Sequence, residues 1–162
     1  MRIMVLSDTH IPRSAHALPE QLLEDIKSSD MVLHAGDFID EEAYELIAKL
    51  KPEFHAVRGN MDSPGLRRRL KDKEIITVGK VKIGLIHGYG APKDLIHTVR
   101  QEFRGVDAIV FGHSHAAVNI TKDGILYFNP GSPTDTIFAK AKTYGILDVT
   151  DAGIEGKIVR LS

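Results

Sequence analysis

The first half of the chain alternates continuous apolar runs with stretches of helical spacing. The continuous runs predict three buried strands, at residues 3–7, 31–35 and 54–57. Apolar residues three and four apart predict two helices between these strands, at residues 18–27 and 41–50. Asp40 stands where the second helix needs an N-cap, and Pro52 lies just past its end. Because strands alternate with helices, we expect parallel strands joined by right-handed crossovers.

The second half of the chain is richer in hairpins. Its apolar runs predict strands at residues 74–78, 81–87, 107–111, 117–121, 125–128, 144–149 and 158–161, with a helix over residues 92–103. Short turns join three pairs of these strands, at residues 79–80, 122–124 and 151–153. No repeat or linker interrupts the pattern. We therefore expect one α/β domain over residues 1–162, in which two packed mixed β-sheets are flanked by helices.

Five of the predicted strands end in, or are followed by, side chains that can bind metal ions. These side chains are Asp8, His10, Asp37, Asn60, His87, His113 and His115. Strands that run in the same direction end on the same edge, and ligand sites of open α/β sheets lie just beyond the carboxyl ends of the strands. Five separate loops are therefore expected to build one site rich in aspartate and histidine.

Each of these short motifs has an ordinary structural explanation when taken alone. Asp8 could cap a helix, and Gly-Asp or Gly-Asn pairs are common in plain turns. In an extended segment, however, Asp8 and His10 would point the same way and could share one ion. The other histidines lie inside apolar strands or lack partners, and we place them outside the ligand set: His16, His34, His55 and His97. The ordered series, rather than any single motif, favours a metal site.

Composition narrows the chemistry. The formal net charge of −1 gives no global field that would attract nucleic acid or an anionic membrane, so neither is an expected partner. The absence of cysteine excludes thiolate nucleophiles and zinc–thiolate sites. The short basic run at residues 67–73 is interpreted as a solvated helix face. No apolar stretch approaches the ~20 residues of a membrane span, and the first residues do not resemble a signal peptide, so we expect a cytoplasmic protein.

Seven ligands exceed what one ion needs if room is to remain for a substrate. They suit two divalent ions about 3.5–4 Å apart that share a carboxylate, for which Asp37 is the candidate. Such a pair acidifies a shared water to hydroxide, orients that hydroxide and neutralises phosphoryl charge. Phosphate ester hydrolysis needs all three effects. A hydrolase that uses one metal ion to cleave amides leaves too many of the ligands unexplained.

The ordered motifs D-x-H, G-D, G-N-x-D, H-G and G-H-x-H between residues 8 and 115 resemble those of the calcineurin-like metallophosphoesterases. The short length, the G-N-M-D sequence at residues 59–62 and the N-P-G-S sequence at residues 129–132 are similar to the small bacterial and archaeal phosphodiesterase branch. That branch includes the retromer subunit with a phosphoesterase-like fold. The resemblance implies a four-layer αββα sandwich with a dinuclear centre at the sheet edge.

The resemblance also implies a role for each ligand. One ion would be held by Asp8, His10, Asp37 and His115, and the other by Asp37, Asn60, His87 and His113. Asp37, Asn60 and His87 are then the expected catalytic residues of a phosphodiesterase. Manganese is the expected metal, with nickel, iron or zinc as alternatives. The expected partner is a small phosphate ester, and formation of a homo-oligomer is left open.

One position departs from the family pattern. Most members carry histidine after the asparagine of G-N-H-D, where it can protonate the leaving oxygen or bind phosphate. Met61 can do neither, and general acid catalysis contributes ~10²–10⁴-fold. The resemblance therefore implies modest turnover, best with good leaving groups. Asp62 would normally orient the missing histidine, so here it is left to support Asn60 or to form a cap.

Three alternatives stay open at this point. The segment 129–132 could present backbone N–H groups to a phosphate, or it could be an ordinary turn. Arg13, Arg58 and Lys93 could anchor a substrate, or they could be simple surface charges. The enzyme function competes with a protein-binding scaffold of the retromer-subunit type that has vestigial or weak hydrolase activity. A scaffold predicts eroded ligands, whereas every ligand position here keeps a competent side chain.

Overall fold

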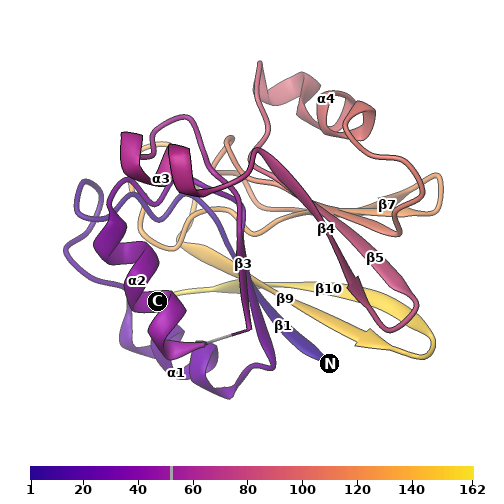
Figure 1. Ribbon diagram of the computed structural model, residues 1–162, viewed down its shortest axis with the longest axis horizontal. Helices are drawn as coiled ribbons and strands as arrows, with labels where there is room; N and C mark the ends of the chain where they lie inside the picture. Colours follow the sequence, from indigo (N-terminus) through magenta and orange to yellow (C-terminus); the bar gives the residue numbers. More distant parts are fainter. Residues whose placement is uncertain (52) are drawn as a thin grey trace.

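The computed structural model describes residues 1–51 and 53–162 of the chain, so the expectation for Pro52 lies outside the described residues. Ten strands form two five-stranded sheets, ordered β10-β9-β1-β2-β3 and β4-β5-β6-β8-β7 (Figure 1). The first sheet contains β1 (Arg2–Leu6), β2 (Met31–His34), β3 (Phe54–Ala56), β9 (Thr143–Thr150) and β10 (Gly153–Arg160). The second contains β4 (Lys73–Val78), β5 (Val81–Ile86), β6 (Ala108–Val110), β7 (Val118–Lys122) and β8 (Ile125–Asn129).

The first sheet confirms the parallel arrangement predicted for the first half of the chain. β1 pairs with β2, and β2 with β3, all in parallel. Helices α1 (Glu20–Ser28) and α2 (Glu41–Leu50) cover the outer face of this sheet, where Leu22 and Ile47 belong to the same buried cluster as Met4 (Figure 1). The predicted N-cap is also confirmed, because the Asp40 carboxylate accepts a hydrogen bond from the backbone N–H of Glu42 at 2.9 Å.

The second half of the chain confirms the three predicted hairpins, but its helix differs from the prediction. The pairs β4–β5, β7–β8 and β9–β10, of which the last belongs to the first sheet, are antiparallel. The predicted single helix over residues 92–103 is instead a 3₁₀ turn, η1 (Pro92–Asp94), followed by α4 (Leu95–Gln101). Asp94 departs from α-helical geometry, with ψ at 0°, and this separates the two segments. Val99 and Phe103 still pack on the outer face of the sheet.

Between the sheets lies the main hydrophobic core. Side chains such as Val5 and Leu33 from the first sheet meet Ile83, Val110 and Phe128 from the second, and all five are fully buried. Burying one such side chain contributes about 1.5–3 kcal/mol to stability. Together with the helices on both outer faces, this core confirms the four-layer αββα sandwich.

Two further elements differ from the sequence prediction: one was not predicted, and the other is longer than predicted. A short helix, α3 (Pro64–Arg69), was not predicted, because it has only one buried apolar residue, Leu66, and contains Gly65. It begins at Ser63, whose hydroxyl accepts from the backbone N–H of Leu66 at 3.2 Å. Strand β10 begins at Gly153 rather than at residue 158, because its whole length pairs with β9 despite weak local strand propensity.

No helix in the described part of the chain is both long enough and apolar enough to cross a membrane.

Candidate metal centre

The structure brings all seven predicted ligands to one end of the sandwich, where loops after β1, β2 and β3 of one sheet meet loops after β5 and β6 of the other. The connection between the sheets is direct, because Nδ1 of His87 lies 2.7 Å from the backbone carbonyl of Ala35. Asp37 is central to the cluster. Its Oδ2 atom lies 3.3 Å from Nε2 of His10 and 3.4 Å from Nε2 of His87.

Two groups of three side chains have ligand atoms close enough together to hold an ion. One group is Asp8, His10 and His115, and the other is Asp8, Asp37 and His87. Asn60 and His113 adjoin the second group, since Oδ1 of Asn60 lies 3.0 Å from Nε2 of His87 and 3.3 Å from Nδ1 of His113. The division resembles the one implied by the family, but geometry places Asp8 in both groups.

Three histidines, His87, His113 and His115, each direct one ring nitrogen toward the cluster. His87 and His113 each place their other nitrogen against a backbone carbonyl, that of Ala35 at 2.7 Å and that of Gly90 at 3.1 Å. His115 places Nδ1 2.5 Å from the Asp135 carboxylate. A carbonyl or carboxylate can only accept, so the proton of each neutral ring lies on that nitrogen. The remaining nitrogens then face the oxygens of Asn60 and Asp8, and a cation bound between them would satisfy these nitrogen and oxygen atoms.

The ligand loops are held in an unusual backbone conformation. Asp8, His10, Asp37, His113 and His115 all have positive φ angles, between 44° and 70°. This left-handed region costs a non-glycine residue about 1–2 kcal/mol, and such residues cluster at functional sites. The prediction that Asp8 and His10 share an extended segment is therefore wrong in its geometry. The two side chains converge because the backbone turns sharply at both positions.

The buried polar atoms of the cluster fit a bound cation. Oδ1 of Asp8 and Nε2 of His10 are buried, and neither has a hydrogen-bond partner among the described residues. Leaving such groups unpaired costs about 1–3 kcal/mol each, a cost that a bound ion would remove. Burial opposes ionisation of Asp8, but the nearby imidazole rings of His10 and His115 outweigh it and hold the pKa of this carboxyl well below its usual range. Burial likewise opposes protonation of His10, but the carboxylates of Asp37 and Asp8 raise its pKa to about 9.

Asp62 does not face the substrate side of the cluster. Its carboxylate accepts hydrogen bonds from the backbone N–H groups of Gly59 at 2.7 Å, Ile39 at 2.9 Å and Asp37 at 3.2 Å. Burial is the main cause of its raised pKa. Asp62 thus joins the loop that carries Asp37 to the loop that carries Asn60. It supports the ligand loops, which is the first of the two roles left open by the sequence.

The sequence did not reveal Asp135. Its carboxylate orients His115. Burial by itself would raise the pKa of Asp135, but the hydrogen bond with His115 and those from backbone N–H groups of its own loop outweigh burial and lower this pKa. Partners of this kind fix the orientation of metal-binding histidines. No local pattern could have marked Asp135, because it lies 20 residues beyond His115 and outside any predicted strand.

The segment 129–132 supports the ligand loops. The Asn129 amide donates to the Gly112 carbonyl at 2.9 Å, and the Ser132 hydroxyl donates to the Asp8 carbonyl at 2.7 Å. Both side chains are fully buried.

The three positive side chains that could anchor a substrate lie in different surroundings. Arg58 forms a salt bridge with Asp72 at 2.6 Å, and Lys93 is exposed on η1. Arg13 lines the cavity over the ligand cluster.

His34 is confirmed as a satisfied buried residue. Its Nδ1 accepts from the backbone N–H of Gly36 at 3.1 Å, so Nε2 carries the proton and donates to the Thr9 hydroxyl at 3.2 Å. The ring stacks on Phe38 with centroids 3.6 Å apart. It therefore joins the first two ligand loops. Burial lowers the pKa of His34 to about 3.

This pKa predicts acid sensitivity of the fold. Unfolded chains bind a proton at His34 below pH 6.5, whereas the folded protein does not until about pH 3, so stability falls as pH drops through that window. Between pH 7.5 and pH 5 the loss from this residue should be about 2 kcal/mol. Urea unfolding of chelator-treated protein at both pH values measures it. Between the two pH values, the free energy of unfolding of His34→Gln should fall by about 2 kcal/mol less than that of the wild type. Equal losses in the two proteins would contradict the lowered pKa of His34.

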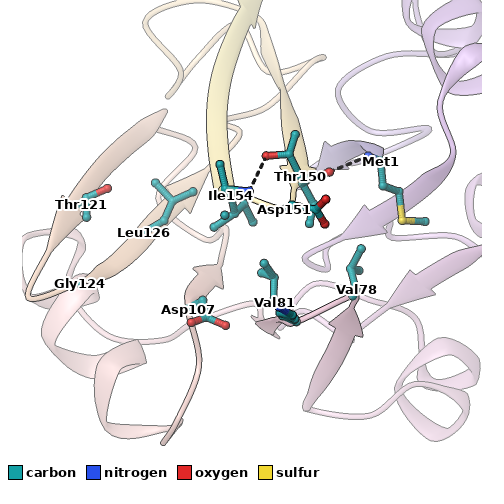
Figure 2. Close-up of a pocket in the computed structure, with 15 residues that line it drawn as sticks. Met1, Val78, Val81, Asp107, Thr121, Gly124, Leu126, Thr150, Asp151 and Ile154 are labelled. Atoms are coloured by element: carbon teal, nitrogen blue, oxygen red, sulfur yellow. Dashed lines mark hydrogen bonds between the residues drawn. The ribbon is translucent and has the colours of Figure 1, made fainter.

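A larger cavity, of about 860 Å³, lies at the opposite end of the sandwich. Figure 2 shows its walls, with Val78 and Val81 on one side and Thr150 and Ile154 on the other. Met1 lines it at the start of β1, whereas the ligand loops follow the other end of that strand. Neither group of candidate metal-binding side chains found in the described residues lies there.

Comparison with known proteins agrees with this geometry. The chain is 36% identical, over 83% of its own length and 69% of the relative's, to a probable metallophosphoesterase of Methanocaldococcus jannaschii. Vps29 of Entamoeba histolytica, solved in complex with Zn²⁺, is 26% identical with a TM-score of 0.75, covering 99% of both chains. A novel archaeal phosphodiesterase shares the fold at 23% identity, with a TM-score of 0.74 over 99% of this chain and 100% of that one. Residues 1–152 match the calcineurin-like phosphoesterase superfamily domain. With its two-sheet sandwich and its Asp/His cluster at the sheet edge, the chain belongs to the calcineurin-like phosphoesterase superfamily.

Proposed function

We propose that this protein is a divalent-metal-dependent phosphodiesterase. The observation that carries the proposal is the convergence of three imidazole nitrogens, of His87, His113 and His115, on the oxygens of Asp8, Asp37 and Asn60. When bound, two divalent cations would lower the pKa of a water molecule and neutralise charge on a phosphoryl group. Nitrogen and oxygen donors together suit Mn²⁺, Fe²⁺, Ni²⁺ or Zn²⁺, and Mn²⁺ is the first ion to test. The Entamoeba relative was solved in complex with Zn²⁺, which supports divalent-metal binding by this chain.

The residues of the chain would divide the work between them. Asp8, His10 and His115 would hold one ion, while Asn60, His87 and His113 would hold the other. Asp37 would be shared between the ions, and this is supported by one of its oxygens facing His10 and His87 at nearly equal distances, 3.3 and 3.4 Å. Its other oxygen accepts from the backbone N–H of Met61 at 2.8 Å, which fixes the orientation of the carboxylate.

The test is hydrolysis of bis(p-nitrophenyl) phosphate by chelator-treated protein reloaded with Mn²⁺, Ni²⁺, Fe²⁺ or Zn²⁺. We expect turnover that returns with the metal and saturates near two ions per chain, read from p-nitrophenolate release and elemental analysis. The control is the same protein reloaded with Ca²⁺, a hard ion that prefers oxygen ligands. Full occupancy by each of the four metals without turnover would refute the enzymatic function.

A protein-binding scaffold is the second candidate, favoured by the similarity to Vps29. Every ligand position here retains a side chain that can bind metal, which supports the enzyme instead. The same experiment separates the two functions, since a scaffold would bind metal with only vestigial turnover or none.

A further inference from the structure

Two adjacent apolar side chains lie unusually exposed beside the ligand cluster. Ile137 is 81% exposed and Phe138 is 77% exposed, whereas the other exposed large apolar side chains of the described residues reach at most 52%. Exposed apolar patches of this kind mark binding surfaces on soluble proteins. The loop that carries the pair follows β8.

The pair forms one wall of the cavity that is lined by five of the seven candidate metal ligands. This cavity, of about 670 Å³, is lined by His10, Asp37, Asn60, His113 and His115, and also by Met61, Ile137 and Phe138. Its volume is within the range of small-molecule sites. Arg13 lines the same cavity and forms no salt bridge within the described part of the chain. Apolar walls and a cation thus adjoin the place where a phosphoryl group would react.

The position of this wall is fixed relative to the ligands. The Asp135 carboxylate, which binds His115, also accepts hydrogen bonds from the backbone N–H groups of Ile137 at 2.8 Å and Phe138 at 3.1 Å. The Phe138 ring meets the His115 ring edge-on, with centroids 6.0 Å apart and planes at 83°. The base of the loop is anchored as well, because the Thr134 hydroxyl donates to the Thr9 carbonyl at 2.6 Å.

We propose that Ile137 and Phe138 form a subsite for an aromatic ester group of the phosphodiester substrate. This inference rests on the proposed function and names the substrate class of the same site. An aromatic group can pack on the Phe138 ring, and the nearby Met61 thioether makes favourable contacts with aromatic rings. Arg13 complements the negative charge of the phosphodiester. Simple aryl esters and nucleoside esters share this chemistry, and the test distinguishes them.

The test compares two substrates with the same leaving group, p-nitrophenyl phenylphosphonate and p-nitrophenyl methylphosphonate, on the Mn²⁺-loaded protein. We expect KM for the phenyl substrate to be about tenfold lower, from burial of one ring. The variant Ile137→Ser/Phe138→Ser should remove this difference by raising KM for the phenyl substrate to the value for the methyl substrate. Thymidine 5′-p-nitrophenyl phosphate is the third substrate. A KM below that of the phenyl compound would identify a nucleoside ester as the ligand, and a higher KM a simple aryl ester.

A binding measurement keeps the outcome separate from that of the proposed function. Calorimetry should show phenylphosphonate binding the Mn²⁺-loaded protein about tenfold more tightly than methylphosphonate, even if neither ester is hydrolysed. Ile75→Ser is the control, because Ile75 is 51% exposed on β4 and lines none of the cavities described above. Equal affinities, and KM values that the double variant leaves unchanged, would overturn the proposal. If the wild type sediments as a dimer, and the double variant sediments as a monomer with unchanged KM, the pair forms a contact between copies of the chain instead.

Discussion

Replacing Asp37 with asparagine is expected to lower kcat/KM for bis(p-nitrophenyl) phosphate by about 10³-fold. Asparagine keeps the shape of the side chain, so its oxygen can still accept from the backbone N–H of Met61. It removes the negative charge, however, and places an amide N–H₂ group between His10 and His87, where a lone pair is needed. Metal content should fall from two ions per chain to one or fewer, which elemental analysis measures together with the kinetics.

Asp148→Asn is the matched control for this variant. Asp148 is exposed on β9, a strand whose ends supply none of the candidate ligands. The control should retain both ions and the wild-type rate. An Asp37→Asn protein that kept two ions and full activity would contradict the assignment of Asp37 as the shared ligand. Unfolding curves of the three proteins check that the loss is not one of stability.

Replacing Met61 with histidine is expected to raise kcat for phosphodiesters with poor leaving groups by about 10²-fold, the lower end of what general acid catalysis supplies. Met61 is 39% exposed and lines the cavity over the ligands, so a histidine there could reach a leaving oxygen. The gain should stay at the lower end because Asp62 is already bonded to three backbone N–H groups and is not free to orient the new ring. A p-nitrophenyl ester needs little protonation, so its kcat should change less than threefold.

The measurement is the dependence of kcat on the pKa of the leaving group across a series of substituted phenyl esters. Wild-type protein should show a steep decline as the leaving-group pKa rises, and the histidine variant a shallower one. Met61→Leu, which keeps an apolar side chain of similar volume, should behave like the wild type. Identical slopes for Met61→His and the wild type would show that the missing proton donor does not limit the rate.

The residues around the cluster show what the chain reveals locally and what it does not. The strands that precede the ligands were predictable, because apolar runs and turn residues act over a few neighbouring positions. The hydrogen bonds that hold the ligands in place were not predictable, because they join segments that are distant in the sequence. The carbonyl that orients His87 belongs to Ala35, 52 residues earlier, and the carboxylate that orients His115 belongs to Asp135. The short helix α3 was missed because its propensity is weak and its stability depends on packing of Leu66.

The sequence by itself determined the order of strands and hairpins, the family and the seven candidate ligands, since each depends on residue type and short spacing. Only the tertiary structure decided how those ligands converge. Two separate sheets bring five loops together, and left-handed backbone angles at Asp8, His10 and Asp37 turn their side chains inward. Only the fold placed Ile137 and Phe138 on a wall of the same cavity. The physical reason is that side-chain direction depends on backbone angles and long-range hydrogen bonds, which form only when the two sheets pack.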